Sequence, residues 1–225
     1  MQVFKAALFD VDGTILDTSE FIFQAYEHTL GKYALPPRSR AEIARLIGQP
    51  LEFCYQMLAP GANVDLLAAT HRAFQAGHLH LAKPYPGANE TLAKLKGAGI
   101  KVAAVTTRSR RTVVGTLEAA GLSVHIDYLV ALEDVVNLKP DPEPVLKALH
   151  YLDAKPHESV MTGDTDVDVL AGKNAGTLTI GVTYGFHGTR IADSSPDYII
   201  DSIEEIIPIV LPVFDLQELQ ESPSK

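Results

Sequence analysis

Six apolar runs of strand length, separated mostly by segments with helical spacing, constrain the fold of this 225-residue chain more than any other feature. The runs are too continuous for antiparallel strands with one exposed face. Strands that alternate with helices predict right-handed crossovers and a parallel sheet covered on both faces. We therefore expect an α/β fold with a doubly wound parallel sheet. The expected strands are residues 3–9, 100–105, 128–132, 159–162, 177–182 and 198–200.

Residues 19–83 interrupt this alternation, because they carry amphipathic helical patterns and no convincing strand. Ser39 and Glu42 form a capping box ahead of one of these helices. We expect the segments 17–19 and 82–86 to be paired hinges. The chain is thus predicted to have a core made of residues 1–18 and 84–225, with residues 19–83 forming a small helical domain inserted after the first strand.

Charge, cysteine content and apolar run lengths exclude several classes of protein. The chain has 28 acidic and 19 basic residues, and its net charge of −9 argues against a nucleic-acid binder. Its single cysteine, Cys54, excludes a disulfide framework and favours a reducing compartment, so we expect a cytoplasmic protein. The longest apolar run, residues 206–214, is broken by Pro208 and Pro212 and is far shorter than the roughly 20 residues of a membrane span. No membrane partner is expected.

Two pairs of aspartates follow predicted strands directly. Asp10 and Asp12 come after the first strand, and Asp164 and Asp168 come after the strand at 159–162. Because the carboxyl ends of parallel strands meet at one edge of a sheet, these four carboxylates should converge there. They would repel one another unless a cation lay among them, and such oxygen ligands favour Mg²⁺. The alternative for each pair is an ordinary acidic turn or helix cap.

Two further strand ends, and the turn after the first strand, supply other polar groups. Thr106 and Thr107 end the strand at 100–105, Lys139 follows the strand at 128–132, and Gly13 permits a tight turn that aims backbone N–H groups inward. Thr106 as a helix cap and Lys139 as an exposed loop residue are the alternatives. Carboxylates, Mg²⁺, a hydroxyl and a lysine are together the groups needed to transfer a phosphoryl group.

In these four motifs, taken in order, the chain resembles the haloacid dehalogenase-like (HAD) hydrolase superfamily over nearly its whole length. The resemblance implies that Asp10 is the nucleophile and a Mg²⁺ ligand. It implies that Asp12 protonates the leaving oxygen, then activates water, and lends its backbone carbonyl to the metal. Asp164 would be a further metal ligand, with Asp168 a second acidic group that orients the metal or its waters.

The same resemblance assigns the remaining parts of the site. It implies that Thr106 and Lys139 hold the phosphoryl oxygens, with Gly13 and Thr107 beside them, and that the helical insert is a cap that excludes water. Resembling dehalogenases lack the second aspartate, so Asp12 favours a phosphate ester or phosphoanhydride as substrate.

Short segments at 17–20, 26–30, 105–108 and 139–145 are similar to bacterial pyrophosphatases of the PpaX type, and the phosphoglycolate phosphatases look much the same. Thr107 occupies a position where resembling sequences often have asparagine, and a threonine there favours the pyrophosphatases. We expect an enzyme, a Mg²⁺-dependent phosphatase that hydrolyses a small phosphorylated metabolite of the phosphoglycolate or pyrophosphate class through an aspartyl-phosphate. The alternatives are a phosphomutase acting on a sugar phosphate and a nonenzymatic phosphate-ligand binder. Either a monomer or a homodimer fits these expectations.

Substrate contacts outside these motifs are harder to predict. Arg108 and Arg111 lie near the start of an expected helix, where cationic side chains are disfavoured by the helix dipole and a bound anion would compensate. Alanine at either position is then expected to raise KM more than it lowers kcat, unless the arginines only pair with acids such as Glu118. Arg45 and Gly48 are candidate contacts by resemblance. His71 is predicted to lie on a solvated helix face.

Overall fold

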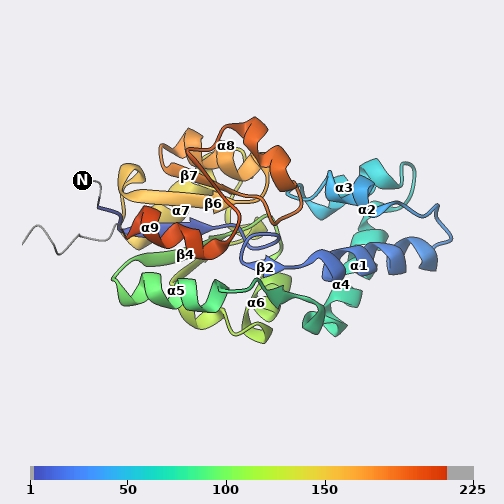
Figure 1. Ribbon diagram of the computed structural model, residues 1–225. Coiled ribbons are helices and arrows are strands. Elements are labelled where there is room, and N and C mark those ends of the chain that lie inside the picture. Colours follow the sequence, from blue (N-terminus) through green and yellow to red (C-terminus); the bar gives the residue numbers. More distant parts are fainter. Residues whose placement is uncertain (1–2, 212–225) are drawn as a thin grey trace, which may run out of the picture.

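The computed structural model describes residues 3–211, and its main feature is a six-stranded sheet (Figure 1). All of its pairings are parallel, in the order β5-β4-β1-β6-β7-β8. Central β1 pairs with β4 and β6, so that Phe9 lies opposite Ala104 and Thr162. The predicted parallel sheet is confirmed, although β1 begins at Ala6 and not at residue 3. The strands are β1 (Ala6–Phe9), β4 (Lys101–Val105), β5 (Tyr128–Val130), β6 (Ser159–Gly163), β7 (Leu178–Val182) and β8 (Tyr198–Ile200).

Helices cover both faces of the sheet. Every residue of its central strand β1 is therefore buried, and all of them are apolar. Ala7 and Phe9 belong to a cluster that includes residues of α5, α6 and α9, whereas Ala6 and Leu8 belong to a second cluster with α7 and α8. Successive side chains of a strand point to opposite faces, which explains this division. The covering helices are α5 (Ala88–Gly97), α6 (Arg110–Ala119), α7 (Glu143–Leu152), α8 (Asp166–Ala175) and α9 (Ile206–Val210).

The helical insert, residues 19–82, lies at one end of the sheet, on the right in Figure 1. The chain leaves the core through β2 (Leu16–Asp17) and returns through β3 (Lys83–Pro84), and these two strands pair antiparallel. The two predicted hinge segments therefore do lie side by side. Two-residue strands are too short to produce a periodic pattern, so the sequence did not predict them. The insert contains α1 (Ser19–Lys32), α2 (Arg40–Ala44), α3 (Leu51–Leu58) and α4 (Val64–Gly77).

Short 3₁₀ helices complete the connections. The predicted capping box at Ser39 and Glu42 is present at the start of α2. Of the apolar run at 206–214, the first residues form α9, and residues 212–214 lie outside the described part of the chain. Between residues 3 and 211, no helix combines the length and apolar character that crossing a membrane requires. The 3₁₀ helices are η1 (Leu79–Leu81), η2 (Ser123–His125), η3 (Leu132–Asp134), η4 (Pro156–Glu158), η5 (Gly188–Ser194) and η6 (Ile203–Glu205).

Candidate active site

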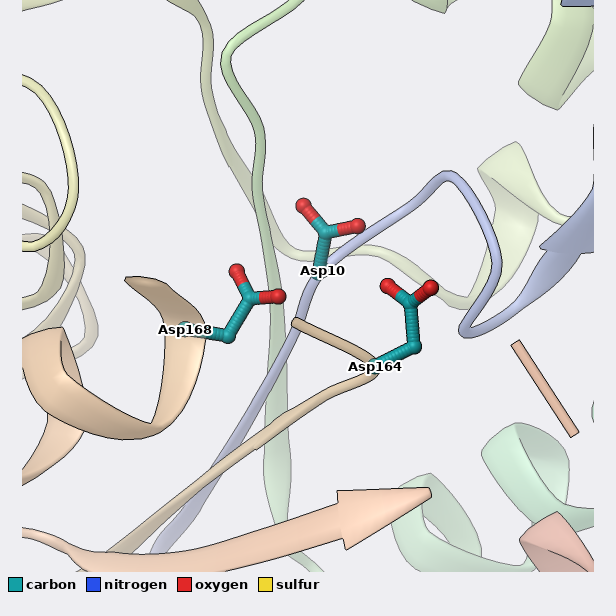
Figure 2. A group of neighbouring side chains, drawn as sticks. All are labelled: Asp10, Asp164 and Asp168. Atoms are coloured by element: carbon teal, nitrogen blue, oxygen red, sulfur yellow. The ribbon is translucent and has the colours of Figure 1, made fainter. Parts of the chain in front are cut away.

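Three aspartates from separate segments meet at the carboxyl edge of the sheet (Figure 2). Asp10 follows β1, Asp164 follows β6, and Asp168 lies in the first turn of α8. One carboxylate oxygen of each lies within 4.8 Å of the other two, and all three residues are buried. The parallel pairing of β1 with β6 brings Asp10 and Asp164 to this edge, as the sequence pattern predicted.

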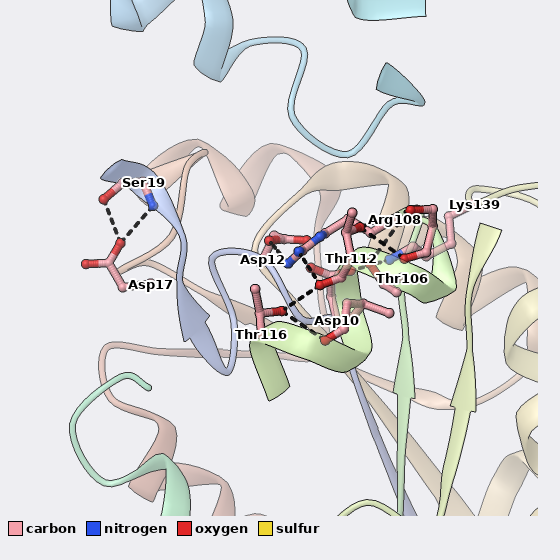
Figure 3. Close-up of polar contacts among 11 residues, drawn as sticks. Asp10, Asp12, Asp17, Ser19, Thr106, Arg108, Thr112, Thr116 and Lys139 are labelled. Atoms are coloured by element: carbon pink, nitrogen blue, oxygen red, sulfur yellow. Dashed lines mark hydrogen bonds and ion pairs between the residues drawn. The ribbon is translucent and has the colours of Figure 1, made fainter. Parts of the chain in front are cut away.

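Lys139 supplies the positive charge beside this cluster (Figure 3). Its Nζ lies 2.6 Å from Oδ1 of Asp10 and 2.6 Å from Oδ1 of Asp168, and it donates to the carbonyl of Val105 at 2.9 Å. Its side chain is only 2% exposed, so it is not a solvated loop lysine. The other oxygen of Asp168 accepts hydrogen bonds from the backbone N–H and hydroxyl of Thr165 at the start of α8, which fixes the carboxylate in place.

Burial makes this cluster electrostatically unusual. Loss of hydration is the main cause that raises the pKa of Asp10 to about 7; nearby Asp168 and Asp12 act in the same direction, and Lys139 opposes them. Burial and the neighbouring carboxylates also raise the pKa of Asp164 well above its usual value. Burial alone would lower the pKa of Lys139, but Asp10 and Asp168 raise it. Three buried carboxylates beside one ammonium group fit a hard divalent cation such as Mg²⁺, because its charge would offset their repulsion.

Asp12 does not join this cluster, contrary to the prediction that four carboxylates would converge. Its Oδ1 lies 3.0 Å from Nη1 of Arg108 (Figure 3). The backbone turns at Val11, whose carbonyl accepts hydrogen bonds from residues 14–16, so Asp12 lies outside the group of three carboxylates although it lines the same pocket as Asp10. The side-chain carboxylate of Asp12 is therefore not among the candidate metal ligands. That its backbone carbonyl binds the metal stays a prediction from the family resemblance.

Gly13 is needed for packing, and its N–H group is already used. It adopts a φ of +80°, and a Cβ atom at this position would lie 2.3 Å from Oδ2 of Asp164. Its N–H donates to the carbonyl of Leu16 at 2.8 Å. The expected tight turn is present, but its own hydrogen bond uses the N–H of Gly13, so this N–H is not among the donors that the turn could aim at a phosphate.

The loop after β7 holds Asp164 and was missed in the sequence. The N–H of Phe186 donates to Oδ2 of Asp164 at 2.7 Å. A Cβ atom on Gly185 would lie 2.3 Å from the Cβ of Asp164, so only glycine fits there. This loop follows a predicted strand, so the same strand-end reasoning that found Asp10 would have indicated it.

A pocket lies between the carboxylate cluster and the helical insert. Asp10, Asp12, Thr107 and Arg108 line it from the core, whereas Thr106 is buried at the end of β4, where its Oγ1 accepts a hydrogen bond from the N–H of Arg108 at 3.2 Å. The lining residues from the insert are Ile22, Tyr26, Ile47, Gly48, Gln49, Leu51, Cys54, His71, Arg72 and Gln75.

His71 is the clearest correction within the insert. It is buried, and its Nδ1 lies 2.9 Å from the hydroxyl of Tyr55. Burial lowers its pKa to about 3, with Arg72 and Arg108 adding to the effect, so the imidazole is neutral at physiological pH. The prediction of a solvated helix face is wrong because this face of α4 packs against Tyr26 and Tyr55.

The candidate substrate contacts divide into two groups. Gly48 and Arg108 line the pocket, and a Cβ on Gly48 would lie 3.3 Å from Oγ1 of Thr165 in the core. Arg45 and Arg111 are exposed and do not line it. Helix α6 begins at Arg110, so Arg108 precedes the helix, and it pairs with Asp12 and not with Glu118.

Comparison with known proteins identifies close relatives. A family model described as haloacid dehalogenase-like hydrolase matches residues 7–182. The chain is 38% identical over 207 residues to Pyrophosphatase PpaX of Halalkalibacterium halodurans, covering 92% of this chain and 96% of that protein. Pyrophosphatase PpaX of Bacillus mycoides is 36% identical over 208 residues, with the same coverage of 92% and 96%.

Solved structures agree with this fold. One from Bacteroides fragilis, described as a haloacid dehalogenase-like hydrolase, has a TM-score of 0.81 and 28% identity and covers 91% of this chain and 100% of that one. A predicted phosphoglycolate phosphatase from Haemophilus somnus 129PT has a TM-score of 0.84 and 24% identity, with coverage of 92% and 97%. Since the family model spans most of the chain and the relatives exceed 30% identity over nine-tenths of it, the chain belongs to the haloacid dehalogenase-like hydrolase family.

Proposed function

We propose that this enzyme is a Mg²⁺-dependent phosphatase that hydrolyses a small phosphorylated metabolite, of the pyrophosphate or phosphoglycolate class, through an aspartyl-phosphate on Asp10. The observation that carries the proposal is the position of Asp10. It is buried among carboxylates that fit a divalent cation, it is held at Oδ1 by Lys139, and it lines the pocket.

Two balanced steps follow from this position. Oδ2 of Asp10 forms a bond to phosphorus while the bond from phosphorus to the leaving oxygen breaks, and Asp12 gives its proton to that oxygen. In the second step Asp12 takes a proton from water as the water oxygen attacks phosphorus. The bond to Asp10 then breaks, inorganic phosphate leaves, and both aspartates regain their starting forms.

The other residues of the cluster neutralise and position charge. Asp10, Asp164 and the backbone carbonyl of Asp12 would hold Mg²⁺, with Asp168 orienting it or its waters, and the ion would offset the charge of the phosphoryl oxygens. Lys139 keeps Oδ1 of Asp10 fixed and adds positive charge next to the phosphoryl group. Thr106 and Thr107 lie at the end of β4 and are proposed to donate to the phosphoryl oxygens.

The substrate class rests on the relatives and on the pocket wall. Two relatives are named Pyrophosphatase PpaX, and a structural neighbour is named a predicted phosphoglycolate phosphatase. Both names describe substrates with a second anionic group next to the reacting phosphate. Arg72 and Arg108 line the pocket and could meet such a group. We infer that the helical insert acts as a cap, because it forms one wall of this pocket and joins the core through two hinge strands.

The test is phosphate release with and without Mg²⁺ from pyrophosphate, 2-phosphoglycolate, sugar phosphates and nucleotides. Asp10→Asn should lower kcat by at least about 1,000-fold, because an amide cannot form the phosphoryl ester. Asp166→Asn is the matched control, since its carboxylate lies between Asp164 and Asp168 in the sequence but its side chain is 60% exposed.

Four results would contradict the proposal. Wild-type turnover by Asp10→Asn would rule out the aspartyl-phosphate. Turnover that does not change when Mg²⁺ is removed by a chelator would rule out the metal dependence. Isomerisation of a sugar phosphate without phosphate release would identify a phosphomutase, and no release from any compound would favour a nonenzymatic binder.

A further inference from the structure

Of the three arginines that follow β4, only Arg108 reaches the pocket. Arg110 pairs with Asp134 on the far side of the loop, and Arg111 is exposed on α6. Arg108 lines the pocket together with Asp10 and Asp12, and its side chain is only 13% exposed. A buried guanidinium beside the reacting groups has a direct effect on them, because little water screens its charge.

Arg108 is held at three points, two of which are hydrogen bonds that Figure 3 shows. Its Nη1 donates to Oδ1 of Asp12 at 3.0 Å, and its Nη2 donates to the carbonyl of Thr112 at 2.9 Å. The guanidinium carbon lies 5.0 Å from the ring centroid of Phe21, in the first turn of α1. Its Nε is buried without a hydrogen-bond partner, so the guanidinium has an unused donor.

This arrangement limits what Asp12 can do. The Asp12 side chain is 9% exposed, and the oxygen bound by Arg108 is unavailable to a leaving oxygen. For Oδ1 of Asp12 to reach the leaving oxygen, its contact with Arg108 must loosen or be replaced. An anion that competes for the guanidinium would have that effect, and a phosphate or carboxylate accepts two parallel N–H bonds from arginine.

We propose that Arg108 is a positioning residue that links substrate choice to turnover: a second anionic group on the substrate takes the guanidinium and frees Asp12 to reach the leaving oxygen. This inference rests on the proposed function. Arg108 lines the same pocket as Asp10, and the group attached to the reacting phosphate must lie in that pocket. A substrate without a second anionic group would leave the Arg108–Asp12 contact in place and would be turned over slowly.

The contacts with Thr112 and Phe21 let the guanidinium change partners with only a small movement. They hold one edge and one face of the guanidinium, so the group can exchange its third partner without leaving the pocket. Because Phe21 belongs to the helical insert, the insert helps to keep Arg108 in reach of both partners. The second anionic group then contributes to the rate after binding, which is measured by kcat and not only by KM.

The test compares substrates that differ in the second anionic group. 2-Phosphoglycolate has a carboxylate where ethyl phosphate has a methyl group, and pyrophosphate has a second phosphate. In the wild-type enzyme, kcat for the better of the two doubly anionic substrates should exceed kcat for ethyl phosphate by about 100-fold or more. The doubly anionic substrate with the larger difference in kcat from ethyl phosphate shows whether the preferred second group is a phosphate or a carboxylate.

In Arg108→Ala, Asp12 is free whichever substrate is bound, so kcat for ethyl phosphate should rise at least about tenfold, the preference in kcat should shrink by the same factor, and KM for the preferred substrate should rise. Arg108→Lys keeps the charge but lacks the planar pair of donors, so its kcat for ethyl phosphate should lie between the values for wild type and Arg108→Ala. Arg111→Ala is the matched control, because this residue is exposed and lies outside the pocket, and it should behave as wild type. An equal loss for all substrates, or a change in KM alone, would overturn the inference and leave the proposed function intact.

A binding measurement gives a readout that does not depend on turnover. Methylenediphosphonate, a non-hydrolysable analogue of pyrophosphate, and methylphosphonate can be titrated calorimetrically into both proteins with Mg²⁺ present. Arg108→Ala should weaken binding of the diphosphonate at least about tenfold and change that of methylphosphonate less than about twofold. Equal affinities of the two proteins for the diphosphonate would overturn the inference. Absence of phosphate release by the wild type, in contrast, would overturn the proposed function.

Discussion

The two walls of the pocket use different interactions. On the sheet side, charged groups lie in direct contact, with Lys139 2.6 Å from both Asp10 and Asp168. On the insert side, the buried groups are aromatic or neutral, and His71 contacts the rings of Tyr26 and Tyr55. Its imidazole is kept uncharged by burial. The comparison indicates that the sheet side holds the charged groups that would act on a phosphate. The insert side mainly determines the shape of the pocket, and Arg72 is its charged lining residue.

The largest effect is expected when the charge balance on the sheet side is broken. In Lys139→Met, buried Asp10 and Asp168 lose their shared cation, and the free energy of unfolding should fall by about 3–5 kcal/mol. Added Mg²⁺ should recover part of this loss, because it brings positive charge back to the cluster. Urea unfolding with and without Mg²⁺ measures both effects.

Lys94→Met is the matched control for that experiment. Lys94 is exposed on α5, so its replacement should change the free energy of unfolding by less than about 0.5 kcal/mol. A loss in Lys139→Met as small as that of the control would mean that Lys139 does not balance the carboxylates. Equal stabilisation of wild type and Lys139→Met by Mg²⁺ would mean that the cation does not replace the charge lost with Lys139.

The same difference explains which parts of the site could be predicted from the sequence. Asp10 and Asp164 were found because each directly follows a strand, and Lys139 was found because it lies in the connection after another strand; parallel pairing carries all strand ends to one edge. The sheet itself was predicted because its apolar runs are local patterns. The Asp12–Arg108 pair joins residues 96 positions apart, and no local pattern encodes which acid a loop arginine meets.

The insert was less predictable because burial there depends on how its helices pack. Along α4, the spacing of His71 fits either an exposed or a buried face, and only the contacts with α1 and α3 decide between them. Arg45 had a family resemblance in its favour, but it is exposed and does not line the pocket. Helical periodicity identifies a face, whereas tertiary packing determines what covers that face.

A smaller effect is expected on the insert side, where the neutral imidazole of His71 makes the free energy of unfolding depend on pH. The folded-state pKa of His71 is about 3, below its value of about 6.5 in an unfolded chain, so the unfolded state binds more protons below pH 6.5. This contribution to stability is therefore present above pH 6.5 and is lost as the pH falls. Replacing His71 with glutamine removes it, so the stability difference between wild type and His71→Gln should narrow by about 2 kcal/mol from pH 7.5 to pH 5.

Urea unfolding at several pH values measures this change, and His80→Gln is the control because His80 is exposed. The comparison between the two proteins cancels titration of the carboxylate cluster, which both retain. If the difference between wild type and His71→Gln stays constant over this range, His71 is not buried in a neutral form, and the contrast between a charged wall and a neutral wall fails.

The smallest effects are expected on KM, in alanine variants of the arginines that are candidate substrate contacts. Arg45→Ala and Arg111→Ala should leave KM for pyrophosphate within about twofold of wild type, because both side chains are exposed and outside the pocket. Arg72→Ala should raise KM about tenfold, since Arg72 lines the pocket and is held 2.7 Å from Glu52 on α3. Steady-state kinetics of the three variants decides the point. If Arg45→Ala raises KM as much as Arg72→Ala, the substrate must reach beyond the present pocket, and the insert then supplies charge as well as shape.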